Sequence, residues 1–127
     1  MLKREAKFQS KFNEWLRTQF KRTGAFELKE TLGPLPFSRV EEHQVNALKA
    51  VKEGTFVYKI SDMSLGAKPF DCFSFSRSKA YVVVLYRTSR TFYGIDIDDF
   101  LLERQRGPRK SLLESRAKEI NCFCSTL

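Results

Sequence analysis

The sequence has no run of apolar residues long enough to span a bilayer, and its first residues lack the apolar segment of a signal peptide. It contains one histidine, three cysteines and no Cys-x-x-Cys pair, which argues against a structural zinc site. Cys122 and Cys124 stand one residue apart, and three cysteines do not make a disulfide framework. We therefore expect a protein of a reducing cytoplasm with no membrane association.

Acidic residues are outnumbered by basic ones. The sequence contains 15 Asp and Glu and 23 Lys and Arg, which gives a net charge of +8. An excess of positive charge favours a polyanionic partner such as nucleic acid. The alternative is an interaction or structural protein whose basic charge is incidental. With 127 residues, the chain is long enough for a single domain with its own core.

Residues 3 to about 22 have the spacing of an amphipathic helix, with large apolar residues recurring on one side. The apolar stripe consists of Phe8, Phe12, Trp15, Leu16 and Phe20. The candidate nucleic-acid contacts on the flanks are Lys3, Arg4, Lys7 and Lys11. Glu5 lies on the apolar side, so it is either solvated at the frayed start of the helix or directed at a functional site.

A short strand is expected at residues 25–31, where Glu27 and Lys29 alternate with Phe26 and Leu28. Residues two apart in a strand point the same way, so Glu27 and Lys29 would project together from one face. An acid and an amine side by side can hold a divalent metal and steady a phosphate or an attacking water. The simpler interpretation is an exposed pair of surface charges.

A proline-containing loop at residues 32–37 precedes a helix that runs from an N-cap at Ser38 to about Lys52. The expected inward stripe of this helix is Val40, Gln44, Ala47, Leu48 and Val51. A polar Gln44 on a buried face needs a partner, which is either a backbone group or a group in a site. His43, one position off the stripe, is interpreted as structural or solvated.

The remaining strands are expected at residues 55–60, 69–75, 80–86 and 91–95, with the apolar run 80–86 at the centre of the sheet. The order strand, helix, strand predicts that residues 55–60 lie parallel to residues 25–31. Tyr81, Tyr86 and Tyr93 suit either the core or a dimer interface. An acidic helix start at Asp96 and a last helix at residues 111–120 complete the pattern. The candidate phosphate contacts in the basic linker before that helix are Arg106, Arg109 and Lys110.

The predicted fold is therefore α/β (α+β), with a mixed central sheet of about five strands flanked by helices. We divide the single domain into a basic amphipathic helix at residues 1–23, a core at 24–102, and a basic linker with a final helix at 103–127.

The order of these motifs resembles the PD-(D/E)XK nuclease superfamily, and within it the Holliday-junction resolvases of the RecU type and their phage relatives. The residues that carry the resemblance are Phe26-Glu27-Leu28-Lys29-Glu30-Thr31, Leu35-Pro36-Phe37-Ser38, Val40, His43-Gln44 and Leu48. The match covers residues 24 to 60 well and the remainder only by pattern, and it implies a restriction-endonuclease-like core.

The resemblance implies a Mg²⁺- or Mn²⁺-dependent endonuclease that cleaves DNA, with branched DNA such as Holliday junctions as substrate. It makes Glu27 the metal-binding acid and Lys29 the lysine of the motif, with Gln44 near the site and Glu5 as a further metal ligand. The family's usual Asp before the Glu-x-Lys strand is missing, because no Asp precedes Asp62. Asp71 is the preferred replacement as metal ligand and catalytic acid, in a permuted order, and Asp62 is the reserve.

Two functions remain in competition with each other. The first is the metal-dependent endonuclease, which would be a two-fold dimer if it resolves four-way junctions. The second is a protein of the same fold that binds DNA without cleaving it.

Overall fold

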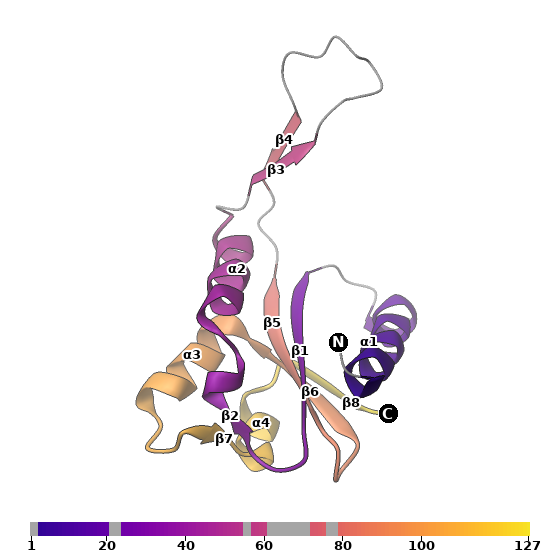
Figure 1. The fold of residues 1–127 in the computed structure, drawn as a ribbon, viewed down its shortest axis with the longest axis vertical. Coiled ribbons are helices and arrows are strands. Elements are labelled where there is room, and N and C mark those ends of the chain that lie inside the picture. Colours follow the sequence, from indigo (N-terminus) through magenta and orange to yellow (C-terminus); the bar gives the residue numbers. More distant parts are fainter. Residues whose placement is uncertain (1–2, 21–23, 55–56, 61–71, 76–78) are drawn as a thin grey trace.

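The apolar run Ala80–Tyr86 forms β5, the strand around which the fold is built, and all seven of its residues are buried. The computed structural model describes residues 3–20, 24–54, 57–60, 72–75 and 79–127 (Figure 1). Its helices are α1 (Lys3–Trp15), α2 (Glu42–Glu53), α3 (Ile97–Arg106) and α4 (Glu114–Ile120), with a π-helical turn at Leu16–Phe20 and a 3-10 turn at Phe37–Arg39. Its strands are β1 (Ala25–Thr31), β2 (Leu35–Pro36), β3 (Val57–Ile60), β4 (Cys72–Phe75), β5, β6 (Thr91–Asp96), β7 (Ser111–Leu112) and β8 (Phe123–Thr126).

The central sheet has four strands in the order β1-β5-β6-β8. β1 runs parallel to β5, with Glu27 opposite Val82 and Lys29 opposite Val84, while β6 is antiparallel to both β5 and β8. The described residues thus contain a mixed sheet flanked by helices, which confirms the predicted α/β class. β1 forms one edge of this sheet.

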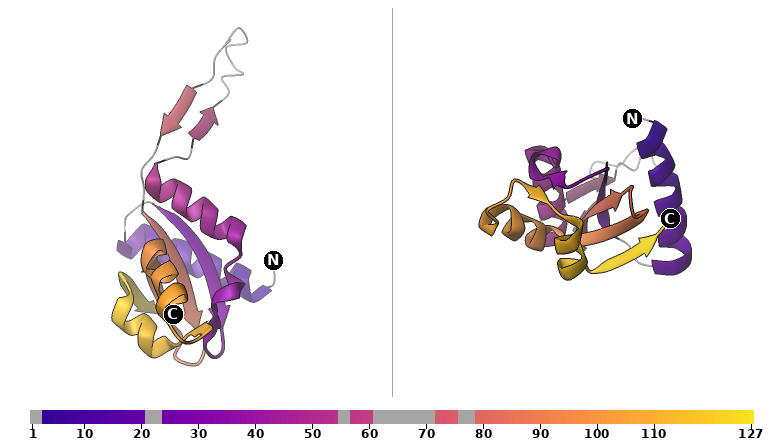
Figure 2. Two further views of the ribbon diagram at one scale, coloured as in Figure 1. Left: turned by 90° about the vertical axis from the view of Figure 1, so that its left-hand side faces the viewer. Right: turned by 90° about the horizontal axis from the view of Figure 1, so that it is seen from below.

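Each face of the sheet has its own apolar layer, and alternate residues of β5 serve the two layers. Val82 and Val84 pack toward α2 and α3, whereas Val83 and Leu85 pack toward α1. Figures 1 and 2 show α1 on one side of the sheet and α2 and α3 on the other. Every side chain of β1 is therefore assigned to a layer by its place in the alternation.

The layer under α1 is rich in aromatic residues. Phe12 is 1% exposed, and its ring centroid lies 5.3 Å from that of Phe26 and 5.4 Å from that of Phe92. Phe8 is also buried, and Trp15 packs against the same cluster. The predicted apolar stripe of the first helix is confirmed at these positions and fixes α1 to the sheet.

The expected pairing of the strand at residues 55–60 was wrong. β3 pairs with β4 in a separate antiparallel hairpin, and the parallel neighbour of β1 is β5. Figure 1 shows this hairpin beyond the end of α2, away from the central sheet. The crossover rule favours consecutive strands as neighbours, but here the chain completes a hairpin before it returns to the sheet.

The fourth strand of the sheet is β8, in a tail for which no strand was predicted. An ideal Cβ at Gly94 of β6 would lie 2.0 Å from Cζ of Phe123, so the Phe123 ring occupies the space that the glycine leaves open. The sheet consequently has four strands instead of about five, because β8 is gained while β3 and β4 stand apart.

Several local boundaries also differ from the prediction. The loop at residues 32–37 contains β2, which pairs with β7, so Ser111 and Leu112 are extended and the last helix begins only at Glu114. Ser38 lies in the 3-10 turn, and the N-cap of α2 is Glu41. The predicted start of α3 and end of α2 are confirmed, since Asp98 N–H donates to the Asp96 carboxylate at 2.9 Å and Gly54 closes α2 with a φ of 76°. The first helix was predicted to reach about residue 22, but α1 ends at Trp15 and is followed by the π-helical turn, while α3 extends to Arg106 in the predicted linker.

The tyrosines of β5 and β6 belong to the core, since Tyr81, Tyr86 and Tyr93 are each less than 5% exposed. The Tyr86 hydroxyl donates to the Leu112 carbonyl at 2.9 Å, and the Tyr93 hydroxyl donates to Glu114 at 2.8 Å. Burial raises the pKa of both phenols, and with the Glu114 hydrogen bond it raises the pKa of Tyr93 to about 12.

The raised pKa of Tyr93 makes the free energy of unfolding depend on pH in the alkaline range. A raised phenol pKa favours the neutral form in the folded state, so the stabilisation is complete below pH 10 and is lost between pH 10 and pH 12. We expect the free energy of unfolding in urea to fall across this range by up to about 1.4 kcal/mol per pH unit for one such group. The decline should be shallower in Tyr93→Phe, and equal slopes in the two proteins would refute this assignment.

Candidate functional site

Glu27 and Lys29 project side by side from β1, as the alternation of the strand predicts. Lys29 Nζ lies 3.7 Å from Glu27 Oε2, and the two side chains are 13% and 28% exposed. Their strand neighbours Phe26 and Leu28 pack into the aromatic layer on the other face. The pair is therefore directed to the face of the sheet that carries α2, and it is largely withdrawn from solvent.

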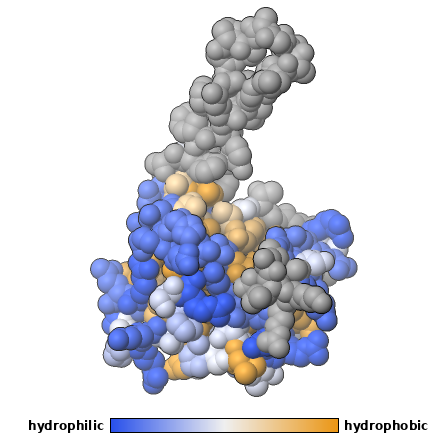
Figure 3. Space-filling view, viewed as in Figure 1, coloured by the Kyte–Doolittle hydropathy of each residue, from blue (hydrophilic) through white to orange (hydrophobic). Residues whose placement is uncertain are grey.

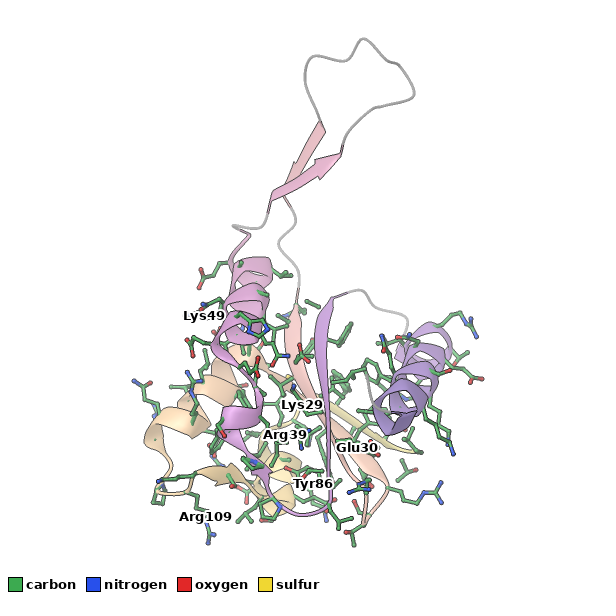
Figure 4. The ribbon with its side chains drawn as sticks, viewed as in Figure 1. Lys29, Glu30, Arg39, Lys49, Tyr86 and Arg109 are labelled. Carbon is green, nitrogen blue, oxygen red and sulfur yellow. The ribbon has the colours of Figure 1, made fainter. Side chains whose placement is uncertain are left out.

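The pair sits at the outer edge of the sheet, where a second cation approaches. Arg39 Nη1 donates to the carbonyl of Glu30 at 3.0 Å, so its guanidinium lies against β1 one residue beyond Lys29. Figure 4 shows Lys29 and Arg39 on the same side of β1, and Glu30 on the other. One carboxylate thus stands beside an ammonium group, with a guanidinium close by, which is a net positive environment suited to a phosphate oxygen.

Glu27 is the carboxylate that the described residues direct to this face of β1. Across these residues, no three Asp, Glu, His or Cys side chains come together as a metal-binding group. Mg²⁺ takes six oxygen ligands and usually draws one or two carboxylates from the protein, with water and substrate phosphate completing the shell. Glu27 offers one carboxylate, and both Asp71 and Asp62 lie outside the described residues.

Gln44 is not directed into a site. Its Oε1 accepts a hydrogen bond from the backbone N–H of Glu41 at 2.9 Å, and the Glu41 carboxylate accepts in return from the backbone of Gln44. This reciprocal capping box satisfies the first turn of α2. Of the two partners considered for Gln44, the backbone group is therefore the one observed. His43 is exposed, with Nδ1 3.3 Å from Glu41.

Glu5 belongs to α1, and the structure does not bring this helix to the Glu27–Lys29 pair. α1 covers the face of the sheet that carries Phe26 and Leu28, while Glu27 points to the opposite face. The side chain of Glu5 lies outside the described residues. The arrangement of the layers argues against Glu5 as a ligand of a metal held by Glu27.

The predicted nucleic-acid contacts fall on two separate parts of the surface. Lys7 and Lys11 are exposed on α1, the helix that also contains the backbone of Lys3 and Arg4. Arg106, Arg109 and Lys110 are exposed at and after the end of α3. Figure 3 shows hydrophilic surface over both α1 and α2, with more hydrophobic residues between them.

Two features of charge were missed by the sequence analysis. Lys52 at the end of α2 contacts Asp96 at 2.5 Å and Asp98 at 2.6 Å. Burial acts to lower the pKa of Lys52, but the hydrogen bonds and charges of the two aspartates outweigh it and raise that pKa. The contact ties α2 to the start of α3. The second feature is a basic hollow next to α1, lined in part by Arg87 and Arg90, neither of which was among the candidate binding residues.

No protein-family model, no curated protein and no solved structure matches this chain. The described part of the chain contains no helix with the length and apolar character needed to cross a membrane. A functional proposal therefore rests on the fold, the Glu27–Lys29 pair and the distribution of charge.

Proposed function

We propose that this protein is a metal-dependent endonuclease that cleaves DNA, with branched DNA such as Holliday junctions as its substrate. The observation that carries the proposal is the Glu27–Lys29 pair, held 3.7 Å apart on one face of β1 with both side chains partly buried. The parallel strands β1 and β5 and the helix α2, which packs on both of them, support this proposal. The net charge of +8 favours a polyanionic substrate.

In this proposal the residues of β1 have separate roles. The ammonium of Lys29 donates hydrogen bonds to a phosphate oxygen or to the attacking water and offsets the negative charge that develops on the phosphate. The carboxylate of Glu27 orients that ammonium and offers an oxygen ligand for Mg²⁺ or Mn²⁺, which would supply further charge neutralisation. The resemblance implies a second acid, for which we propose Asp71 in a permuted motif order, with Asp62 as the reserve.

The role of Asp71 gives a direct prediction. Asp71→Asn keeps the size of the side chain but removes a charged oxygen ligand, so metal-dependent cleavage should fall to background while the circular dichroism spectrum and urea midpoint stay as in the wild type. Asp62→Asn is the matched variant and should leave cleavage intact. If the Asp62 variant is the inactive one, the assignments of the two aspartates are exchanged; cleavage by both variants at the wild-type rate excludes both.

A second candidate function is DNA binding without cleavage. It is favoured by the absence of a three-ligand acidic group from the described residues and by the use of Gln44 in a helix cap. Such a protein would bind DNA with an affinity that falls steeply with salt, because phosphate contacts release counterions.

One experiment separates these functions. A labelled four-way junction and a linear duplex of the same sequence are incubated with the wild-type protein in Mg²⁺, in Mn²⁺ and in EDTA. Cleavage that occurs in Mg²⁺ or Mn²⁺ but not in EDTA supports the nuclease function. Faster cleavage of the junction than of the duplex supports branched DNA as the substrate. Tight, salt-sensitive binding with no cleavage in any metal supports the binding protein. Failure to bind either DNA at low salt contradicts both functions.

Junction cleavage also implies an assembly and a place of action. Two symmetric nicks require two active sites related by a two-fold axis, so we propose a homodimer. We further propose that the protein works in a reducing cytoplasm, which is supported by the free, exposed thiols of Cys122 and Cys124.

A further inference from the structure

Four cationic side chains meet at a hollow of about 330 Å³ between α1 and the turn that joins β5 to β6. Lys7 and Lys11 reach it from α1, and Arg87 and Arg90 reach it from the turn. Glu30 of β1 contributes the single acidic side chain of the lining, so the lining side chains together carry a charge of +3, and Leu127 also borders the hollow. In the described part of the chain, none of these four cations lies in an ion pair.

Arg87 is the most informative member of the group. Its backbone N–H donates to the Thr31 carbonyl at 2.9 Å, which extends the ladder between β1 and β5 and fixes its position. Its Nε atom is buried and finds no hydrogen-bond partner among the described residues. The Arg87 side chain lines the hollow, and among the described residues it makes no hydrogen bond or ion pair, so its outer guanidinium nitrogens are donors available to an anion.

The position of the hollow in the fold also favours a ligand. It lies where the parallel strands β1 and β5 end, and open α/β sheets bind their ligands outside the carboxyl ends of such strands. Arg90 adopts a left-handed backbone with a φ of 56°, an uncommon conformation for a residue other than glycine that is often kept at binding sites. The carbonyl of Arg90 accepts from Leu127 N at 2.8 Å, so the turn is tied to the end of β8.

We propose that this hollow binds a phosphate group. Cations approach it from α1 on one side and from the β5–β6 turn on the other, an arrangement that suits a tetrahedral anion with acceptor oxygens in every direction. Guanidinium groups bind phosphate through two parallel hydrogen bonds, and the flexible lysines add charge. The phosphate is either the terminal group of a nucleic-acid strand, an internal phosphodiester, or free inorganic phosphate.

This site is separate from the proposed cleavage site. Glu30 faces the α1 side of β1, whereas Glu27 and Lys29 face the α2 side (Figure 4). The inference therefore goes beyond the proposed nuclease function, and phosphate binding can be measured without any cleavage. If the protein binds phosphate here but cuts no DNA, this inference is supported and the nuclease proposal is contradicted. If it cuts DNA but binds no phosphate here, the nuclease proposal is supported and this inference is contradicted.

The test is a calorimetric titration of the full chain with inorganic phosphate. Two variants weaken the hollow from opposite sides, namely Arg87→Gln and the double variant Lys7→Ala/Lys11→Ala. Each should raise the dissociation constant at least about 10-fold, since one charge-assisted contact is worth that much or more. Lys49→Ala removes a half-exposed cation of α2 outside the hollow and should bind phosphate like the wild type.

The lysines are exposed, so the double variant keeps the test valid if Arg87→Gln fails to fold. Phosphate affinity unchanged in the double variant and in any folded Arg87 variant would overturn the proposal, and so would an absence of phosphate binding by the wild type.

Short single-stranded oligonucleotides distinguish the sources of the phosphate. Tighter binding of a 5′-phosphorylated strand than of its 5′-hydroxyl form, with the difference lost in the double variant, identifies a terminal phosphate. Equal binding of the two strands, with a shallower salt dependence in the double variant, identifies an internal phosphodiester. If the double variant loses inorganic phosphate alone and binds both strands like the wild type, the ligand is free phosphate.

Discussion

Replacing Lys29 by alanine is expected to reduce metal-dependent cleavage of a four-way junction by roughly 100-fold or more, because removing one preorganised donor to developing charge typically costs that much. The effect should be large because Lys29 is only 13% exposed, and charges shielded from water interact more strongly. Binding of the junction should change little, since one phosphate contact is a small part of the total. The measurement is a single-turnover rate with saturating protein.

The matched control for this variant is Lys49→Ala. Lys49 is a lysine of α2 whose side chain is 43% exposed and lies 4.0 Å from Glu53, so its removal lowers the net charge equally without changing β1. It should cleave at the wild-type rate. If Lys29→Ala and Lys49→Ala cleave the junction at the same rate, Lys29 has no catalytic role, and that part of the proposed mechanism is wrong.

Phe12→Ala is expected to lower the free energy of unfolding by about 3–5 kcal/mol, the usual cost of deleting a fully buried phenyl ring. Phe12 is 1% exposed, and its ring contacts those of Phe8, Trp15, Phe26, Phe92 and Phe123. Its loss opens a cavity at the centre of the layer that fixes α1 to the sheet. Urea denaturation followed by circular dichroism gives the free-energy change.

The control for this prediction is Gln9→Ala, an exposed position in the same helix. It should change stability by less than about 0.5 kcal/mol, as surface substitutions generally do. A Phe12→Ala variant as stable as Gln9→Ala would mean that α1 is not packed on the sheet. In that case the hollow lined by Lys7 and Lys11 would also lose its support.

Elements with a strong local pattern were predictable from the sequence. β1 was expected at residues 25–31 and is observed at Ala25–Thr31, because apolar and polar residues alternate there. The continuous apolar run of β5 correctly indicated a strand buried on both faces. The start of α3 was predictable because the Asp96 side chain accepts a hydrogen bond from the backbone N–H of Asp98, and these two residues are close in the sequence.

Features that depend on distant pairing were not predictable. Whether β3 or β5 lies beside β1 is decided by contacts across many residues, and a local pattern contains no information on that choice. β8 joins the sheet because the Phe123 ring fits over Gly94, a contact between residues far apart in the chain. The last helix is shortened for a similar reason, since Leu112 pairs with Leu35 and is held extended.

The candidate site shows the same division. The adjacency of Glu27 and Lys29 follows from the period of a strand, so the sequence predicted it. That Gln44 would serve the helix cap depended on where α2 begins, and the expected N-cap at Ser38 was three residues too early. The basic hollow joins α1, β1 and the β5–β6 turn, and only the fold brings those segments together.

The most direct test of the proposed active site compares the wild type with Glu27→Gln, a variant that keeps the shape of the side chain and removes its charge. Both proteins are incubated with a labelled four-way junction in Mg²⁺, and the initial rates of cleavage are measured. We expect cleavage by the wild type that stops in EDTA, and a rate lower by roughly 100-fold or more in the variant. Equal rates for the two proteins, or wild-type cleavage that persists in EDTA, would contradict it.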